Sequence, residues 1–264
     1  MSTVFRVDFS NPLVWIPPAF FVWMIGGLFT TYGIASSYGQ ISTPPEWPSI
    51  SSTGAYPPTS CIFTMVLCFG AIIGFFTILY YYQYLKIGFS TKINQSINKT
   101  MLILGLLVCF GTAIVGCNQR PNIAVLHAIG AFMAFIIGAV YCGFATYMSY
   151  TIKKFYPEAY PNWFIFFRGT LVVLEALSFI LMLVFSAQRA NSRTKATLGN
   201  TFEWCVVSIQ CIFYATFAVE FSNLKQPGLV IGMTRKAELF LKRGEVENDE
   251  QQMVSRFEQA VATH

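Results

Sequence analysis

Six long apolar runs dominate this sequence and leave few folds open to it. Each run holds about 20 largely apolar residues, the length that a helix needs to cross the hydrocarbon core of a bilayer. Hydrophobic residues make up 55% of the chain and charged residues only 11%, against roughly 25% charged residues in ordinary globular chains. The sequence therefore predicts an all-α polytopic membrane protein, a bundle of six transmembrane helices. The predicted spans are residues 13–35, 61–84, 101–117, 123–147, 163–187 and 202–222.

Lysine and arginine are distributed unevenly between the two sides of the predicted bundle. Of the 17 Lys and Arg residues, one side holds only Arg120, Arg189, Arg193 and Lys195. Because cytosolic segments carry the excess of Lys and Arg, the other side, which includes both termini, is predicted to be cytosolic. The first run is too long for a signal peptide, although Arg6 precedes it, and we expect an uncleaved span. Residues 1–223 then form the transmembrane domain and residues 224–264 a cytosolic tail.

The longest outer loop, residues 36–60, is rich in proline and serine, and Glu46 is its only charged residue. Proline fixes φ and lacks an N–H group, so this segment cannot continue a helix. The simplest interpretation is an exposed connector. Trp47 and the ordered run Ile50–Phe63 instead indicate a specific structure, in which Gly54 permits a tight turn and Pro57-Pro58 directs the chain into the second span.

The run from Gly39 to Phe63 resembles the signature of the DRAM–Frag–Sfk family of six-span proteins, roughly I-S-D-T-G-x-x-P-P-E-S-x-x-F. Three further stretches resemble the family in order: Gly116–Pro121, His127–Ala131 and Phe202–Cys205. The close of the last span, Phe213–Phe221, is nearer to the transmembrane protein 150 branch than to the autophagy-modulator branch. The residues that carry the signature here are Ser51, Thr53, Gly54, Tyr56, Pro57, Pro58, Ser60 and Phe63.

The sequence departs from the family pattern at three positions. Ser52 stands where the family usually has Asp, Thr59 where it usually has Glu, and Ala128 where some members carry an acid. Roles that rest on those carboxylates do not carry over to this chain.

The resemblance implies a non-enzymatic membrane regulator or scaffold, involved in phosphoinositide homeostasis at the plasma membrane or in autophagy at endosomes or lysosomes. A related branch assists the lipid remodelling of glycosylphosphatidylinositol anchors, so a lipid-handling protein is the alternative. A channel or transporter subunit is the third class. The expected partners are membrane lipids and membrane or peripheral proteins, with no nucleic acid.

Five ionisable residues at membrane depth are candidate functional groups, because such residues are costly there. Glu175 lies midway along the fifth span, and is expected to be protonated or hydrogen-bonded within the bundle. Arg168 and Glu220 lie near the cytosolic ends of the fifth and sixth spans, where they can pair, although Arg168 can equally extend to lipid phosphates. His127 and Glu203 share the outer end of the fourth and sixth spans, where a pH-sensitive contact is one interpretation and a solvated histidine the other.

The sequence contains no catalytic constellation, and neither a cofactor nor a metal is expected. Of the seven cysteines, Cys61 and Cys117 lie at helix ends on the same predicted side, and their pairing stays open. The tail has a basic half, which is a candidate surface for anionic lipids such as phosphoinositides. The usual excess of basic residues on the cytosolic side of a span also explains this charge. Its candidate residues are Arg235, Lys236, Lys242 and Arg243.

Asn94 and Asn98 head glycosylation sequons in the loop between the second and third spans. We predict that neither carries a glycan, because the predicted topology places this loop in the cytosol. Digestion of the expressed protein with an N-glycosidase is expected to leave its electrophoretic mobility unchanged. A glycan mapped to either asparagine would overturn the orientation.

Overall fold

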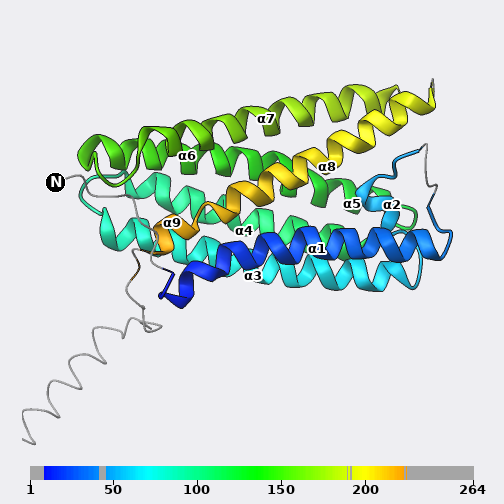
Figure 1. Ribbon diagram of the computed structural model, residues 1–264, viewed down its shortest axis with the longest axis horizontal. Coiled ribbons are helices and arrows are strands. Elements are labelled where there is room, and N and C mark those ends of the chain that lie inside the picture. The colour runs from blue at the N-terminus through cyan, green and yellow to red at the C-terminus, as the bar shows by residue number, and fades with distance from the viewer. Residues whose placement is uncertain (1–8, 42–45, 189, 191, 223, 225–264) are drawn as a thin grey trace, which may run out of the picture. The chain divides into compact units, whose positions relative to one another are not determined.

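The computed structural model describes residues 9–41, 46–188, 190, 192–222 and 224, which form a bundle of long helices (Figure 1). Six helical segments are long and apolar enough to cross a membrane, which confirms the predicted all-α fold with six spans. The candidate lipid-surface residues of the tail lie outside the described residues. The observed spans are Pro12–Ser37, Thr59–Gly88, Gln95–Cys117, Ala124–Phe155, Asn162–Ala187 and Arg193–Phe221.

Three spans are single helices, and the first, fourth and sixth are composite. The fourth is interrupted by η2, a π-helical turn, which is a rare element that often occurs at functional sites. In chain order the elements are η1 (Pro12–Trp15), α1 (Ile16–Ser37), α2 (Ile50–Thr53), α3 (Thr59–Gly88), α4 (Gln95–Cys117), α5 (Ala124–Phe132), η2 (Met133–Ile137), α6 (Gly138–Phe155), α7 (Asn162–Ala187), α8 (Arg193–Ala215) and α9 (Ala218–Phe221).

Several helices begin earlier or end later than the apolar runs predict. The third begins at Gln95 rather than residue 101, and the sixth at Arg193 rather than residue 202. Hydropathy marks only the part of a helix that meets hydrocarbon, whereas the polar first turns need caps or water. In α4 the Asn94 side chain supplies such a cap by accepting a hydrogen bond from the Ser96 N–H group.

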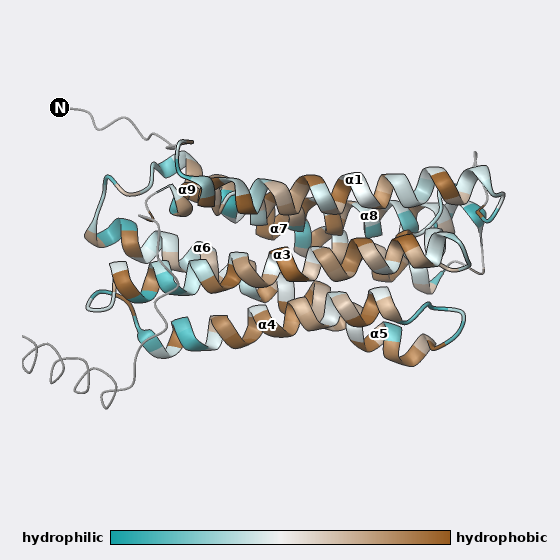
Figure 2. Cartoon of the chain, turned by 90° about the horizontal axis from the view of Figure 1, so that it is seen from below, coloured by the Kyte–Doolittle hydropathy of each residue, from teal (hydrophilic) through white to brown (hydrophobic). Residues whose placement is uncertain are grey.

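The spans form a ring in which each packs against its neighbours in sequence. α1 packs on α3, α3 on α4, α4 on the α5–η2–α6 span, α6 on α7 and α7 on α8, and contacts between α8 and α1 close the ring. α2 and α5 lie at one end of the bundle and α9 at the other (Figure 1). The helix shafts are largely apolar and the connecting loops more polar (Figure 2), as a bilayer requires.

Close approach between helices depends on small residues. A Cβ atom at Gly111 of α4 would lie 2.4 Å from Met133 Cβ and 2.8 Å from the Gly130 carbonyl oxygen. A Cβ atom at Gly130 would in turn lie 2.8 Å from the Gly111 carbonyl oxygen. The fourth span therefore lies directly against α4, a packing mode typical of membrane helices.

We predict that Gly111→Ala destabilises the bundle by about 1–3 kcal/mol, because the added methyl group meets backbone atoms that cannot rotate away. Gly169→Ala is the matched control, since a Cβ atom there meets nothing within 4 Å. Thermal unfolding of the detergent-purified protein is expected to show a lower melting temperature for Gly111→Ala alone. Equal melting temperatures for the two variants would contradict this packing.

Candidate functional site

The outer Pro-rich loop is folded against the bundle. We call residues 46–60 of this loop the cap. Asn200 Nδ2 donates to the Trp47 carbonyl oxygen at 2.8 Å, and Trp204 Nε1 donates to the Pro48 carbonyl oxygen at 3.0 Å. The Trp47 ring also lies between Tyr32 and Trp204, with centroids 5.1 Å and 5.8 Å away. Among the described residues, this loop is therefore a structural element rather than a tether.

Two signature residues, Gly54 of the cap and Phe63 of α3, contact each other directly. Phe63 is buried, and a Cβ atom on Gly54 would lie 2.2 Å from Phe63 Cγ. Gly54 has φ −107°, which any residue can adopt, so the turn itself does not demand glycine. The turn predicted at Gly54 is present, but the space that the Phe63 ring occupies, rather than the backbone conformation, is what requires glycine there.

The other signature residues divide between the interior and the surface. Thr53 is fully buried and its hydroxyl donates to the Ile50 carbonyl oxygen at 2.7 Å. Ser51 and Ser60 are buried as well. Tyr56, Pro57 and Pro58 are exposed, so the described structure gives them no packing role.

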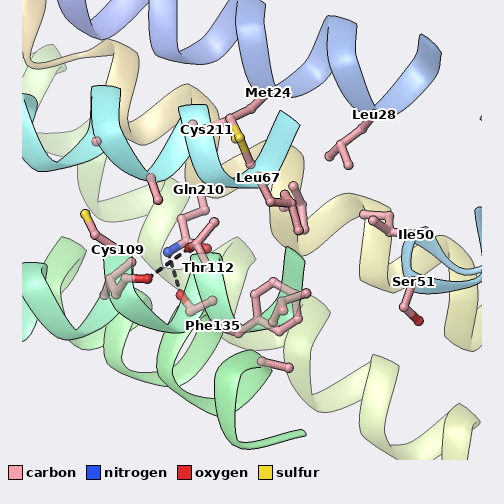
Figure 3. Close-up of a pocket in the computed structure, with 18 of the residues that line it drawn as sticks. Met24, Leu28, Ile50, Ser51, Leu67, Cys109, Thr112, Phe135, Gln210 and Cys211 are labelled. Atoms are coloured by element: carbon pink, nitrogen blue, oxygen red, sulfur yellow. Dashed lines mark hydrogen bonds between the residues drawn. The ribbon is translucent and has the colours of Figure 1, made fainter. Parts of the chain in front are cut away.

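Beneath the cap, the bundle encloses a cavity of about 110 Å³ (Figure 3). Ile50 and Ser51 of α2 form part of its lining at the cap end. Most other lining residues are apolar and come from α1, α3, α4, the fourth span and α8. The polar side chains in the lining are Ser51, Thr112, His127, Glu203, Gln210 and Tyr214.

His127 and Glu203, which the sequence places at a common helix end, both contribute to this lining. His127 Nδ1 lies 2.7 Å from the Asn118 carbonyl oxygen and must donate to it, because a carbonyl only accepts. Glu203 Oε1 accepts from the Ser51 N–H group at 3.3 Å. The structure thus brings the two residues to one cavity and ties Glu203 to the cap, while the pH-sensitive contact stays a prediction.

The deeper part of the cavity contains two polar groups that the sequence analysis missed. Gln210 Nε2 donates to the Ala134 carbonyl oxygen of the π-helical turn at 2.9 Å, and Gly138 leaves room for it. Tyr214 is buried, and its hydroxyl has no hydrogen-bond partner among the described residues. A buried hydroxyl without a partner is uncommon and is one mark of a site that receives water or a ligand.

Glu175 lies in α7, with 1% of its surface exposed. Neither carboxylate oxygen has a hydrogen-bond partner in the described part of the chain. Cys142, Cys211 and Tyr214 lie within electrostatic reach of it. Of the two states expected from the sequence, the hydrogen-bonded one is therefore not found, and a neutral side chain fits these surroundings better than a charged one.

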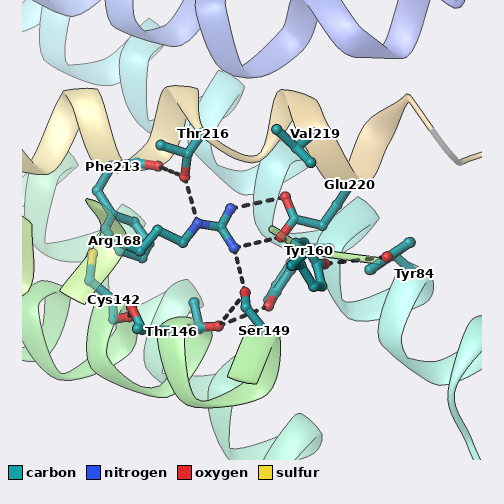
Figure 4. Close-up of polar contacts among 12 residues, drawn as sticks. Tyr84, Cys142, Thr146, Ser149, Tyr160, Arg168, Phe213, Thr216, Val219 and Glu220 are labelled. Atoms are coloured by element: carbon teal, nitrogen blue, oxygen red, sulfur yellow. Dashed lines mark hydrogen bonds and ion pairs between the residues drawn. The ribbon is translucent and has the colours of Figure 1, made fainter. Parts of the chain in front are cut away.

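Arg168 and Glu220 form a buried ion pair toward the α9 end of the bundle (Figure 4). Arg168 Nη1 donates to Glu220 Oε1 at 2.5 Å and Nη2 donates to Oε2 at 2.9 Å. Both side chains are fully buried, so Arg168 does not extend to lipid phosphates here. The pairing expected from the sequence is present, and its two-bond geometry is the strong form of this interaction.

Further donors and acceptors complete the ion pair. Arg168 Nη1 also donates to Ser149 Oγ at 2.6 Å and Nε donates to Thr216 Oγ1 at 2.9 Å. The Tyr160 hydroxyl donates to Glu220 Oε1 at 3.0 Å. The network joins α6, α7, the end of α8, α9 and the loop before α7. No sequence signal identified Ser149, Tyr160 or Thr216, since hydroxyl residues are common in membrane helices and only their positions distinguish these.

The described residues contain no group of three or more His, Cys, Asp or Glu side chains that could hold a metal ion. The cavity lining holds one histidine and one acid, and the ion-pair network has all its charges engaged with each other. The functional roles of the individual residues stay predictions.

Comparison with known proteins identifies relatives along most of the chain. Residues 12–224 match the family described as the Frag1/DRAM/Sfk1/Cwh43P N-terminal domain. The modulator of macroautophagy TMEM150B of Mus musculus is 33% identical over 216 residues, 81% of this chain and 87% of its own length. The DNA damage-regulated autophagy modulator protein 2 of Rattus norvegicus is 27% identical over 197 residues, 74% of this chain and 72% of its own length. No solved structure matches.

Truncating one partner of the buried ion pair is expected to be strongly destabilising. Arg168→Leu leaves the Glu220 carboxylate buried without its cation, and such losses typically cost about 3–5 kcal/mol. The double variant Arg168→Leu/Glu220→Leu is expected to recover much of that loss, because it leaves no unpaired charge. Melting temperatures in detergent measure both effects.

Arg193→Ala is the control for that comparison. Its side chain is 89% exposed and pairs with Glu46 at 3.3 Å on the surface, where ion pairs contribute little. If Arg168→Leu lowered the melting temperature no more than Arg193→Ala does, the buried pair would not hold the helices together.

Proposed function

Because the chain belongs to the Frag1/DRAM/Sfk1/Cwh43P family, we propose that it is a membrane-embedded modulator of autophagy that acts by binding rather than by catalysis. The names of its relatives, modulators of macroautophagy and of damage-regulated autophagy, support the process. The capped cavity is the observation that carries the mode of action. It is a partly open, mainly apolar space at the end of the bundle where the family signature lies.

The construction of the cap supports this interpretation. Ile50 and the signature residue Ser51 line the cavity, and the Ser51 N–H group donates to Glu203 of α8. A change in the cavity is therefore transmitted to the cap, and through the cap to the surface that Tyr56 and the two prolines expose. A modulator that exposes a different outer surface when its cavity is occupied needs no chemical step.

The finer parts of the proposal concern place and lipid. We place the protein in the plasma membrane or in the endosomal or lysosomal membrane, with both termini in the cytosol. The tail residues Arg235 and Lys236, with Lys242 and Arg243, would then face the anionic inner leaflet, which connects the protein to phosphoinositide homeostasis. Endogenous tagging, scored against markers of these membranes, tests the location directly.

Lipid handling is the second candidate, and the cavity itself favours it. An apolar interior with polar groups at the cap end, including Glu203 and His127, matches an amphipathic molecule. Purified protein in liposomes separates the classes: transfer of labelled lipid between vesicles supports lipid handling, ion conductance supports a channel, and neither activity supports the regulator.

We predict that Ala131→Leu abolishes the effect of the protein on autophagy, because the larger side chain fills the cavity that Ala131 lines. The measurement is autophagic flux, the gain in lipidated autophagosome marker when lysosomal acidification is blocked. Cells that lack the protein are complemented with each variant. Wild-type protein is expected to move flux away from the deletion baseline, and Ala131→Leu to leave it there.

Ala128→Leu is the matched control, since Ala128 lies on the same helix, α5 continued by η2, with its side chain exposed. Both variants must reach the same membrane at the same level. If deletion leaves flux unchanged, the proposed process is wrong. If Ala131→Leu restores flux as wild type does, the process stands but the cavity is not its site.

A further inference from the structure

Two thiols from different helices face each other near the cap end of the bundle. Cys68 of α3 and Cys117, the last residue of α4, have their Sγ atoms 3.6 Å apart. Both are free thiols in the structure. A disulfide has its sulfurs about 2.05 Å apart and its Cβ atoms about 3.8 Å apart. The two sulfur atoms must therefore move closer together, by an amount that rotation about the side-chain torsions can supply.

The backbones of α3 and α4 are close at this point for independent reasons. A Cβ atom at Gly116 would lie 2.8 Å from Leu67 Cβ, so the residues just before the two cysteines are in direct contact. The Thr64 hydroxyl also donates to the Gly116 carbonyl oxygen at 2.6 Å. The helix spacing that brings the thiols together is therefore fixed by packing and by a hydrogen bond between the helices.

The structure explains why Cys61, the partner considered for Cys117 from the sequence, is the less suitable one. Cys61 and Cys68 are seven residues apart on α3, so they lie on the same face but about 10 Å apart along the helix axis. Cys117 at the end of α4 is level with Cys68. The structure thus sets Cys68, rather than Cys61, beside Cys117.

We infer that Cys68 and Cys117 form a redox-active pair that closes to a disulfide when a disulfide oxidant such as oxidised glutathione reaches the cap end. Cys117 is exposed and reacts first: its thiolate attacks one glutathione sulfur, forms a mixed disulfide and releases a glutathione thiolate. The Cys68 thiolate then attacks Cys117 Sγ and releases the second. The two protons lost by the cysteines end on the two glutathione thiols, so one disulfide is reduced as another forms.

The location of the pair gives the bond a consequence for the cavity. Leu67, next to Cys68, and Val115, two residues before Cys117, both line it. A disulfide at this point fixes the distance between the two helices that form one wall. In the predicted orientation the cap end faces the oxidising side of the membrane, where such bonds persist.

The test uses the full chain in detergent. The protein is first reduced and then held in a glutathione buffer set to the redox potential of the endoplasmic reticulum. Free thiols are blocked under denaturing conditions, the protein is reduced, and newly freed thiols are labelled with a maleimide polymer that retards migration. Wild-type protein is expected to gain two labels. Cys117→Ser should gain none, Cys68→Ser no more than the one label of an unresolved glutathione disulfide on Cys117, and Cys61→Ser should still gain two.

Three outcomes overturn the inference. Wild-type protein that gains no label has no oxidisable pair. Loss of the labels in Cys61→Ser assigns the bond to Cys61 instead. A dimer on a non-reducing gel, lost in Cys117→Ser, shows that the bond joins two chains rather than two helices of one chain.

Discussion

Hydrocarbon offers no hydrogen-bond partner, and this constraint governs every polar group that the bundle carries. The ion pair of Arg168 and Glu220 meets the constraint most fully, since both charges are buried and their hydrogen bonds are made to each other and to three hydroxyl groups. The aromatic rings of Phe164, Phe213 and Phe217 lie 4.6–5.4 Å from the guanidinium carbon. Such a cluster ties four helices and a loop into one arrangement.

The cap end meets the same constraint differently. There the polar groups are distributed around a cavity, and several act between elements: Glu203 bonds the cap, His127 bonds the Asn118 carbonyl oxygen before α5, and Gln210 bonds the π-helical turn. Each of these bonds joins two segments, whereas the ion-pair network joins five. We therefore expect local opening to cost less at this end than at the ion pair, in line with the general finding that binding regions are drawn from the less stable parts of a fold.

The sequence predicted the features that depend on composition along one helix. Spans follow from apolar runs, and the pairing of Arg168 with Glu220 follows because both lie near the same end of neighbouring spans. The missed features depend on distances between helices. Two examples are the contact of Gly54 with Phe63 and the position of Cys117 beside Cys68. Both can be predicted only when the distance between the helices is known. The π-helical turn cannot be predicted either, because its residues have ordinary helical character.

Glu175 shows how the two ends of the bundle are connected. It lies two turns of α7 from Arg168, and Tyr214, in electrostatic reach of it, lines the cavity. Glu220, the other buried acid among the described residues, has bonded partners, whereas Glu175 and the Tyr214 hydroxyl have none there. A shift of α7 against α8, or a molecule that enters between them, would give these groups a partner. The unsatisfied groups lie between the ion-pair network and the cavity, so a rearrangement of the cap end would reach the ion pair through them.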